Sequence, residues 1–188
     1  MDLFTALMQR RSVPSRQLGA PGPDATQRRA LFEAAMRVPD HGKLAPWRFL
    51  TIEGEPRHRL GERLATRAKA LDPNAPQAAI DKDRERFSFA PLIVAVIGTP
   101  VEGHKVPVVE QLMSGGAVCF ALLQAAQGLG FGAQWLTGWA AYDREILDGL
   151  GLAPHEQLLG FIHIGTAQGE APERLRPSLD AKLTEWSP

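Results

Sequence analysis

A run of two arginines and a serine, Arg10-Arg11-Ser12, carries residue types that could bind a phosphate group. Guanidinium groups make paired, charge-assisted hydrogen bonds to phosphate oxygens, and a neighbouring hydroxyl adds a further donor. The run follows residues 3–8, whose apolar side chains recur at helical spacing behind the capping residue Asp2. Arginines are also favoured at a helix C-terminus by its dipole. For this run alone, that structural role is the simpler interpretation.

A second polar stretch, residues 40–43 (Asp-His-Gly-Lys), lies between Pro39 and Pro46. Because each proline biases the residue before it away from helical conformation, the stretch is predicted to be a loop stiffened at both ends. Loops held on a rigid scaffold often position ligands. Taken alone, the stretch is more simply an ordinary connection from a helix to a strand.

The apolar periodicity predicts the elements that would position these residues. Strands are predicted at 47–52, 91–98, 131–137 and 158–164, where apolar, aromatic and β-branched residues run together. Segment 91–98 is apolar almost throughout, which is typical of a central strand buried on both faces. Helices are predicted after Asp2, from Asp24 to about Arg37, after Pro56 with Leu60, Leu64 and Leu71 as a buried stripe, at 108–127 and at 142–150.

These elements predict one α+β domain over residues 1–188, in which 171–188 form a C-terminal extension without a strand pattern. The helix at 108–127 is apolar on almost every side in its middle, so it should lie inside a protein or a dimer. Gly115 and Gly116 reduce its helix propensity. Close approach of another element would be a reason to accept that cost.

Composition excludes several classes of partner and site. The 21 basic and 21 acidic residues leave no net charge, which gives no support for nucleic acid as the main partner. The single cysteine, Cys119, excludes an internal disulfide and a multi-cysteine metal site, and we expect it to be a small core residue. No cluster of His58, His155 or His163 with acidic residues has ligand spacing, so no metal is predicted.

The N-terminal residues have their basic side chains after the apolar run, the reverse of the order in a secretory signal. The longest apolar-rich stretch, 117–126, contains Gln124 and is far shorter than the roughly 20 residues of a membrane span. We therefore expect a cytoplasmic protein without membrane contact.

Residues 128–133 match the pattern Gly-x-Gly-x-x-Ala of a dinucleotide-binding turn. That mechanism needs a strand before the glycines and a helix after them, so that a pyrophosphate meets a helix N-terminus. Here a long helix comes before and a strand after. We interpret the glycines as a helix C-cap and a tight turn, and predict no Rossmann fold.

Four separated pieces of the chain together resemble the FMN-dependent nitroreductase family. They are Arg10-Arg11-Ser12, the Val-Pro-Asp-His and Pro-Trp-Arg-Phe sequences within 38–49, residues 104–114, and residues 130–138 (Gly-Phe-Gly-Ala-Gln-Trp-Leu-Thr-Gly). The Pro-Asp-His sequence and residues 104–114 resemble the smaller YdjA-type subgroup, and the resemblance extends from about residue 2 to 168. In the loop before Pro46, most of the wider family has serine, asparagine and glutamine where this chain has Asp40, His41, Lys43 and Ala45.

The resemblance implies an α+β homodimer with a central, mostly antiparallel sheet flanked by helices and the long apolar helix at the dimer interface. It implies two FMN sites at that interface, each built from both chains. One chain would contribute Arg10, Arg11 and Ser12, the partner would contribute Arg37 and His41, and Trp135, Leu136 and Thr137 would run beside the flavin ring.

The resemblance leaves two further questions open. A basic contact from the tail to the FMN phosphate could come from Arg174 or Arg176. Glu110 could face the substrate pocket, although a favourable charge at a helix N-terminus is the simpler interpretation.

The activity implied is an FMN-dependent NAD(P)H oxidoreductase, in which hydride passes from the nicotinamide to flavin N5 and then to an acceptor such as a nitroaromatic or quinone. Chemistry of this kind belongs to the cofactor, and no catalytic side chain is required. Two alternatives stay open: a protein that carries or senses FMN without turnover, and a related flavin enzyme with another substrate.

Overall fold

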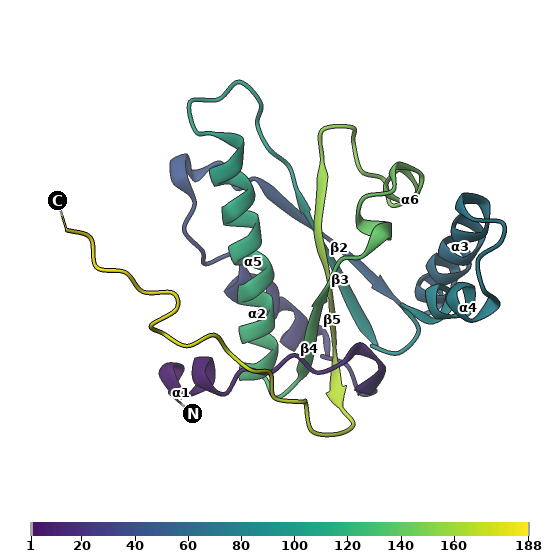
Figure 1. The fold of residues 1–188 in the computed structure, drawn as a ribbon, viewed down its shortest axis with the longest axis horizontal. Coiled ribbons are helices and arrows are strands. Elements are labelled where there is room, and N and C mark those ends of the chain that lie inside the picture. Colours follow the sequence, from purple (N-terminus) through teal and green to yellow (C-terminus); the bar gives the residue numbers. More distant parts are fainter. Residues whose placement is uncertain (1, 188) are drawn as a thin grey trace.

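The computed structural model describes residues 2–187. Its helices and strands alternate along the chain as an α+β arrangement (Figure 1). In order they are α1 (Leu3–Met8), β1 (Leu18–Gly19), α2 (Ala25–Ala35), β2 (Trp47–Glu53), α3 (Glu55–Leu71), α4 (Gln77–Glu85), β3 (Leu92–Gly98), α5 (Val108–Gly128), β4 (Gly132–Leu136), α6 (Arg144–Gly149) and β5 (Gln157–Ala167), with short 3₁₀ turns at Ser15–Gln17, His41–Lys43 and Trp139–Ala141.

The five strands form one antiparallel sheet. Strand β3 lies between β2 and β5, and the far edge of β5 pairs with β4 over Phe161–Gly165 and with β1 over Thr166–Ala167. All seven residues of β3 are buried, because helices cover both faces of the sheet. The predictions of an antiparallel sheet and of a central strand at 91–98 are confirmed.

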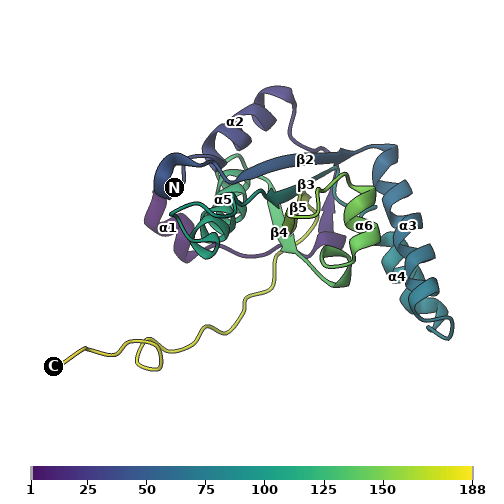
Figure 2. The same cartoon turned by 90° about the horizontal axis from the view of Figure 1, so that it is seen from above.

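Two apolar cores lie on opposite faces of the sheet, and Figure 2 shows the helices that cover them. One face packs against α2 and α5 through Val94, Ile162 and Val118. The other packs against α3 and α6 through Leu64, Ile93 and Phe161. Because side chains alternate along a strand, neighbouring residues of β3 and β5 enter different cores.

A bulge in β5 joins the sheet to α5. The pairing of β3 with β5 shifts between Val96 and Ile97, which leaves Leu159 as an extra residue. Its side chain packs on α5 at Gly115, where a Cβ would overlap it. This close approach accounts for Gly115, whereas Gly116 has open space beside it.

The glycines after α5 form the helix end and tight turn that the sequence predicted. Helix α5 ends at Gly128, and the amide of Phe131 donates to the carbonyl of Ala126 across the turn. Gly130 has a φ of +84°, a backbone conformation typical of glycine at a helix end, and β4 begins two residues later. A helix thus precedes the glycines and a strand follows, so the chain has no Rossmann turn at this point.

Several predicted elements differ from the structure. Helix α4 was not predicted, because Ile80 is its only large apolar residue. Leu71 is 56% exposed, so its place in the buried stripe of α3 was wrong, whereas Leu60 and Leu64 are buried. Cys119 is fully buried as expected, and burial raises the pKa of its thiol to about 12.

Helix α5 buries one side against the sheet and α2 and leaves the other side apolar. The exposed fractions of Val109, Met113 and Phe120 are 61%, 69% and 42%. Among residues 2–187, α5 is the one helix long and apolar enough to cross a membrane, because the apolar segment continues beyond the predicted stretch 117–126. Its other side is nevertheless packed into the core, as in a core helix of a folded domain.

The C-terminal arm, residues 171–187, projects away from the sheet and the helices (Figures 1 and 2). It contains no helix or strand within its described residues. Its large apolar side chains are exposed, including Leu175, Leu179 and Trp186.

Candidate functional site

The segment that follows α1 lies along the free edge of β4. The amide of Val13 donates to the carbonyl of Ala133 (3.1 Å), and the amide of Ser15 donates to Oε1 of Gln134 (2.6 Å). These two hydrogen bonds bring the predicted run Arg10-Arg11-Ser12 to the same sheet edge as the predicted residues 135–137. Two pieces more than 120 residues apart in the chain thereby share one surface.

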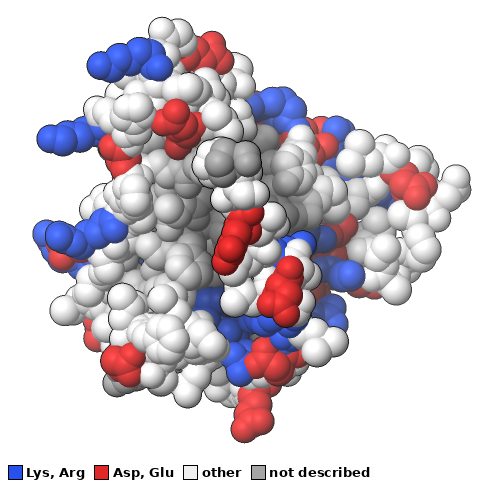
Figure 3. Space-filling view, turned by 60° about the vertical axis from the view of Figure 1, so that its left-hand side comes forward, with Lys and Arg blue, Asp and Glu red and all other residues white. Residues whose placement is uncertain are grey.

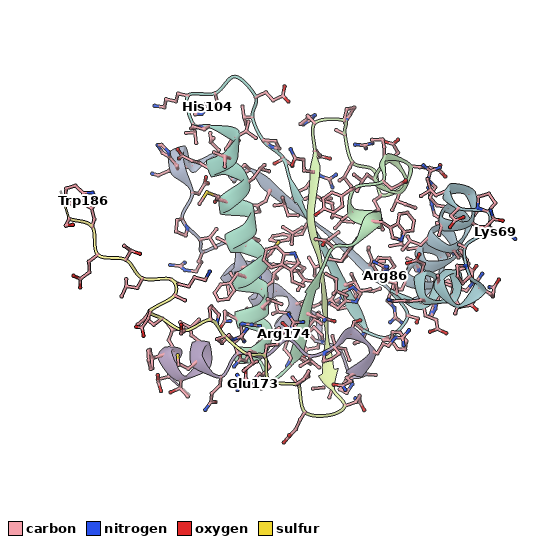
Figure 4. The ribbon with its side chains drawn as sticks, viewed as in Figure 1. Lys69, Arg86, His104, Glu173, Arg174 and Trp186 are labelled. Atoms are coloured by element: carbon pink, nitrogen blue, oxygen red, sulfur yellow. The ribbon has the colours of Figure 1, made fainter. Side chains whose placement is uncertain are left out.

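A group of guanidinium side chains gathers at this edge. Arg10 Nη1 donates to Ser12 Oγ (3.2 Å), and Arg11 forms an ion pair with Glu173 of the C-terminal arm. Burial lowers the pKa of Arg10, and the positive charges of Arg176, Arg11 and Arg174 lower it further, while Glu173 opposes them. Figure 4 shows Glu173 and Arg174 where the arm passes the C-terminal end of α5. The positive charge of these arginines therefore exceeds the negative charge of Glu173.

The arm places both of its candidate arginines near Arg10. Arg176 has the larger effect on the Arg10 pKa and Arg174 the smaller. One carboxylate, that of Glu173, stands among four guanidinium groups, so an anion at this position would relieve their mutual repulsion. The sequence left the two arm residues as alternatives, and the charges of both act on Arg10.

The end of β4 lines a pocket of about 420 Å³. Trp135, Leu136 and Thr137 form one side of it, and Ser15 and Arg16 belong to another. The Trp135 indole N–H donates to the carbonyl of Leu159 (3.0 Å), a carbonyl in the bulge of β5. The ring covers Gly160, where a Cβ would overlap it, so the bulge and this glycine fix the indole.

The polar loop after α2 docks on the N-terminal half of α5. Ser114 Oγ donates to the carbonyl of Pro39 (2.5 Å), and His41 Nδ1 lies 2.7 Å from Glu110 Oε2. The Asp40 carboxylate accepts hydrogen bonds from the amides of Leu44 and Ala45, which closes the turn. The side chains of His41, Glu110 and Ser114 line a second pocket of about 300 Å³. Glu110 thus faces a pocket as well as standing in the first turn of α5.

The predicted site residues fall into two groups that one chain keeps apart. At the C-terminal end of α5, Gln127 Nε2 donates to the carbonyl of Ala6 in α1 (3.3 Å), which places Arg10–Ser12 nearby. At the other end, Glu110 contacts His41. With a rise of about 1.5 Å per residue, these contacts lie roughly 25 Å apart along the helix. The exposed Arg37 precedes the loop of the second group.

Sequence comparison identifies the family. A model of the family described as "Nitroreductase family" matches residues 7–166, which is most of the chain. The chain belongs to the nitroreductase family. This nitroreductase-family chain is also 37% identical over 171 residues to the Escherichia coli protein named "Putative NAD(P)H nitroreductase YdjA", with 91% of each chain covered. The resemblance that four short pieces indicated is confirmed.

Solved structures confirm the nitroreductase-like fold. A nitroreductase-like family protein from Bacillus cereus superimposes with a TM-score of 0.82 at 20% identity, covering 99% of this chain and 96% of the other. A Desulfovibrio desulfuricans protein described as a "putative nitroreductase in complex with fmn" gives a TM-score of 0.74 at 24% identity, covering 100% of this chain and 99% of the other. At these identities the structures establish the fold alone.

Two residues at this edge were not predicted as site residues from the sequence. Gln134 holds Ser15 from within β4, and Arg86 lines the 420 Å³ pocket from the turn after α4. Both act through contacts between distant segments. Gln134 lies within the family-like piece 130–138 but had no predicted role, and Arg86 belongs to no recognisable motif. Within residues 2–187 no group of three His, Cys, Asp or Glu side chains could hold a metal ion.

His163 of β5 lies directly behind the edge, paired with Gln134. It is 1% exposed and stacks on Phe87 with ring centroids 5.7 Å apart. Neither ring nitrogen has a hydrogen-bond partner among the described residues. Burial, assisted by the charge of Arg86, lowers the pKa of His163 to about 4, so the ring is neutral near pH 7.

Proposed function

We propose that this chain is an FMN-dependent oxidoreductase that uses NADH or NADPH to reduce a small electron acceptor such as a nitroaromatic or a quinone. Membership of the nitroreductase family and the likeness to a relative named as an NAD(P)H nitroreductase support the proposal. The observation that carries it is the group of Arg10, Arg11, Arg174 and Arg176, which the segment 12–15 links to the pocket at the end of β4.

The residues present fit FMN by charge. A phosphate monoester carries nearly two negative charges near pH 7. The four guanidinium groups carry more positive charge than the one carboxylate neutralises, so a phosphate would balance it. The Ser12 hydroxyl stands beside Arg10 and could donate to the same phosphate. Arg10, Arg11, Ser12 and one or both arm arginines would therefore hold the phosphate.

The residues also fit FMN by length. Segment 12–15 spans at most about 10 Å and leads from the guanidinium group to the pocket at Trp135, Leu136 and Thr137. A flat, largely apolar ring system suits a pocket with an indole on one side. The bound flavin would supply the chemistry of accepting and donating hydride, while the protein positions it and excludes water.

We propose further that two chains complete each site. Arg37 and His41 lie at the far end of α5 from Arg10, so residues of both groups meet one FMN only if the second group comes from a partner. The exposed apolar side of α5 supplies a surface for that partner. The proposed assembly is a homodimer that works in the cytoplasm.

The first experiment separates an enzyme from an FMN carrier or sensor. Purified holoprotein is mixed without oxygen with NADH or NADPH, and the flavin absorbance is followed. We expect the yellow colour to bleach and to return when a nitroaromatic or quinone is added. A flavin that stays oxidised in excess NADH and NADPH would support the carrier or sensor instead.

The second experiment tests the shared site by complementation. Arg10→Ala and Arg37→Ala should each weaken FMN binding about ten- to a hundredfold, the value of a charge-assisted contact of roughly 1.5 to 3 kcal/mol. A heterodimer of one Arg10→Ala chain and one Arg37→Ala chain places both changes in one site and leaves the other intact. Half of the FMN should then bind with normal affinity. Two equally weakened sites would place both arginines within one chain.

A further inference from the structure

The C-terminal arm is joined to the domain by one carboxylate. Its base at Ala171 packs against one of the two apolar cores. Two residues further on, Glu173 forms an ion pair with Nη2 of Arg11. Within the described residues, no other hydrogen bond or ion pair joins 172–187 to the remainder of the chain. Figure 4 shows Trp186 at the far end of the arm, well away from Glu173. The arm therefore depends on this contact for its position beside the domain.

The Glu173 carboxylate uses both of its oxygens. Oε2 contacts Arg11, and Oε1 accepts a hydrogen bond from the amide of Arg174 (2.9 Å), which keeps the carboxylate facing Arg11. Burial and the neighbouring guanidinium groups lower the pKa of Arg10, whereas the charge of Glu173 raises it. Glu173 thus serves as an internal counter-ion for the arginines that we propose bind the phosphate.

The Arg11 guanidinium is engaged on two nitrogens by the chain itself. Nη1 donates to the carbonyl of Arg10 (3.3 Å), and Nη2 contacts Glu173, so a phosphate that uses Nη2 must replace the carboxylate. The pair lines a cavity of about 730 Å³, and the side chains of Arg11 and Glu173 are 33% and 55% exposed. An anion from solution can therefore reach the contact, and partly exposed ion pairs of this kind are readily exchanged.

We propose that Glu173 competes with the FMN phosphate for Arg11. The inference rests on the proposed function. Both anions offer a guanidinium two acceptor oxygens, but a phosphate monoester brings nearly two negative charges where the carboxylate brings one. The arm is thus an autoinhibitory strap: Glu173 leaves Arg11 when the phosphate arrives, and an arm arginine meets the phosphate in its place. A contact formed in about four of five molecules lowers the apparent affinity for FMN about fivefold, because only the remaining fraction binds.

The test measures binding of FMN to the apoprotein, by the quenching of flavin fluorescence, for the wild-type protein and Glu173→Gln. Glutamine keeps the size of the side chain and removes its charge. We expect FMN to bind the variant about fivefold more tightly, the size expected from the loss of one partly exposed ion pair. Riboflavin, which has no phosphate, should bind the two proteins equally. An unchanged FMN affinity, or an equal gain for riboflavin, would overturn the proposal.

Glu170→Gln is the matched control, because Glu170 lines the same cavity and has no ion pair with Arg11. Its loss removes the same charge and should leave the FMN affinity unchanged. An equal gain from both variants would assign the effect to the general field of the arm and overturn the displacement. Should Glu173→Gln fail to fold by circular dichroism, Glu173→Ala makes the same comparison.

Arg11→Gln tests whether Glu173 acts through Arg11. In this background the Glu173 carboxylate has lost its partner, so adding Glu173→Gln should no longer tighten FMN binding. A gain that persists without Arg11 would show that the carboxylate does not compete for this guanidinium.

Inorganic phosphate tests the strap without a flavin. Titration calorimetry should show tighter phosphate binding to Glu173→Gln than to the wild-type protein, and equal affinities would overturn the strap. Failure of the wild-type protein to bind FMN, together with the expected difference for phosphate, would instead refute the proposed function and support the strap.

Discussion

The two faces of the sheet are closed in different ways. On one face, α3 carries charged side chains outward, and Arg67 reaches Asp143 at the start of α6 (3.0 Å) while Arg86 and Trp139 meet at Asp83. On the other face, α5 has one charged residue, Glu110, and an apolar outer side. Figure 3 brings this side forward, and large parts of it carry no charged side chain.

The comparison indicates which face one chain can complete by itself. A helix with charged residues outward is stable against water, whereas exposed apolar patches on a folded protein usually mark an interface. The face of α3 is therefore complete within one chain, and we expect the face of α5 to be completed by a second copy. Substitutions on the two faces test this difference.

The largest effect should follow from charges on the outer side of α5. Met113→Glu together with Phe120→Glu would bury four unpaired carboxylates in a symmetric interface, at a cost of several kcal/mol. We expect a folded monomer whose FMN affinity falls at least a hundredfold, although no residue of the guanidinium group has changed. Light scattering and flavin fluorescence at low micromolar protein measure both properties.

The matched control places two glutamates at exposed positions of α3, with Thr66→Glu and Lys69→Glu. This variant should keep its mass and its FMN. A wild-type protein that is a monomer when loaded with FMN would contradict the role given to α5.

An intermediate effect is expected from Phe161→Ala in the core of the α3 face. Phe161 is 1% exposed and packs edge-on against Phe87 with centroids 4.8 Å apart. Removing a buried phenylalanine costs about 3 to 5 kcal/mol of unfolding free energy. Because this face is complete in one chain, denaturant titrations should give the same loss at every protein concentration.

Phe120→Ala provides the contrast, since Phe120 lies on the outer side of α5. Its loss of stability should depend on protein concentration, because dissociation accompanies unfolding. A loss independent of concentration would place Phe120 outside any interface.

The smallest effect should be the pH dependence contributed by His163. Its pKa falls from 6.5 to about 4 on folding, so between these values the unfolded chain binds more protons than the folded one. Stability from this residue is therefore complete above pH 6.5 and is lost as the pH falls toward 4, by roughly 3 kcal/mol. His163→Leu should lose less stability over this range. Equal pH profiles for the two proteins in urea titrations would show that the ring is not held neutral.

The sequence predicted the parts of the fold that periodicity controls. The bounds predicted for the long helix, 108–127, differ from those of α5 by one residue, because its apolar pattern is continuous. Helix α4 has a single large apolar residue, and its contacts with α3 stabilise it, so no local pattern could indicate it. Strand β5 continues beyond its predicted end at Ile164 because Thr166 and Ala167 pair with β1.

The candidate site likewise contains residues that the sequence indicated and contacts that it did not. The run Arg10–Ser12 and residues 135–137 were found because their types and order resemble a family, and their roles as FMN ligands remain predictions. The link from Asp83 to Arg86 and Trp139 was missed, because a hydrogen bond across 56 positions leaves no spacing to recognise. Contacts of this kind arise only once the sheet has brought the segments together.

The bulge at Leu159 makes the Trp135 indole an optical reporter of assembly. Leu159 presents its side chain to α5 at Gly115 and its carbonyl to the indole, so one residue touches both. A displacement of α5 by a partner would move this carbonyl and change the surroundings of the half-exposed indole. The emission of Trp135 should therefore respond to dilution of the protein even before any flavin is added.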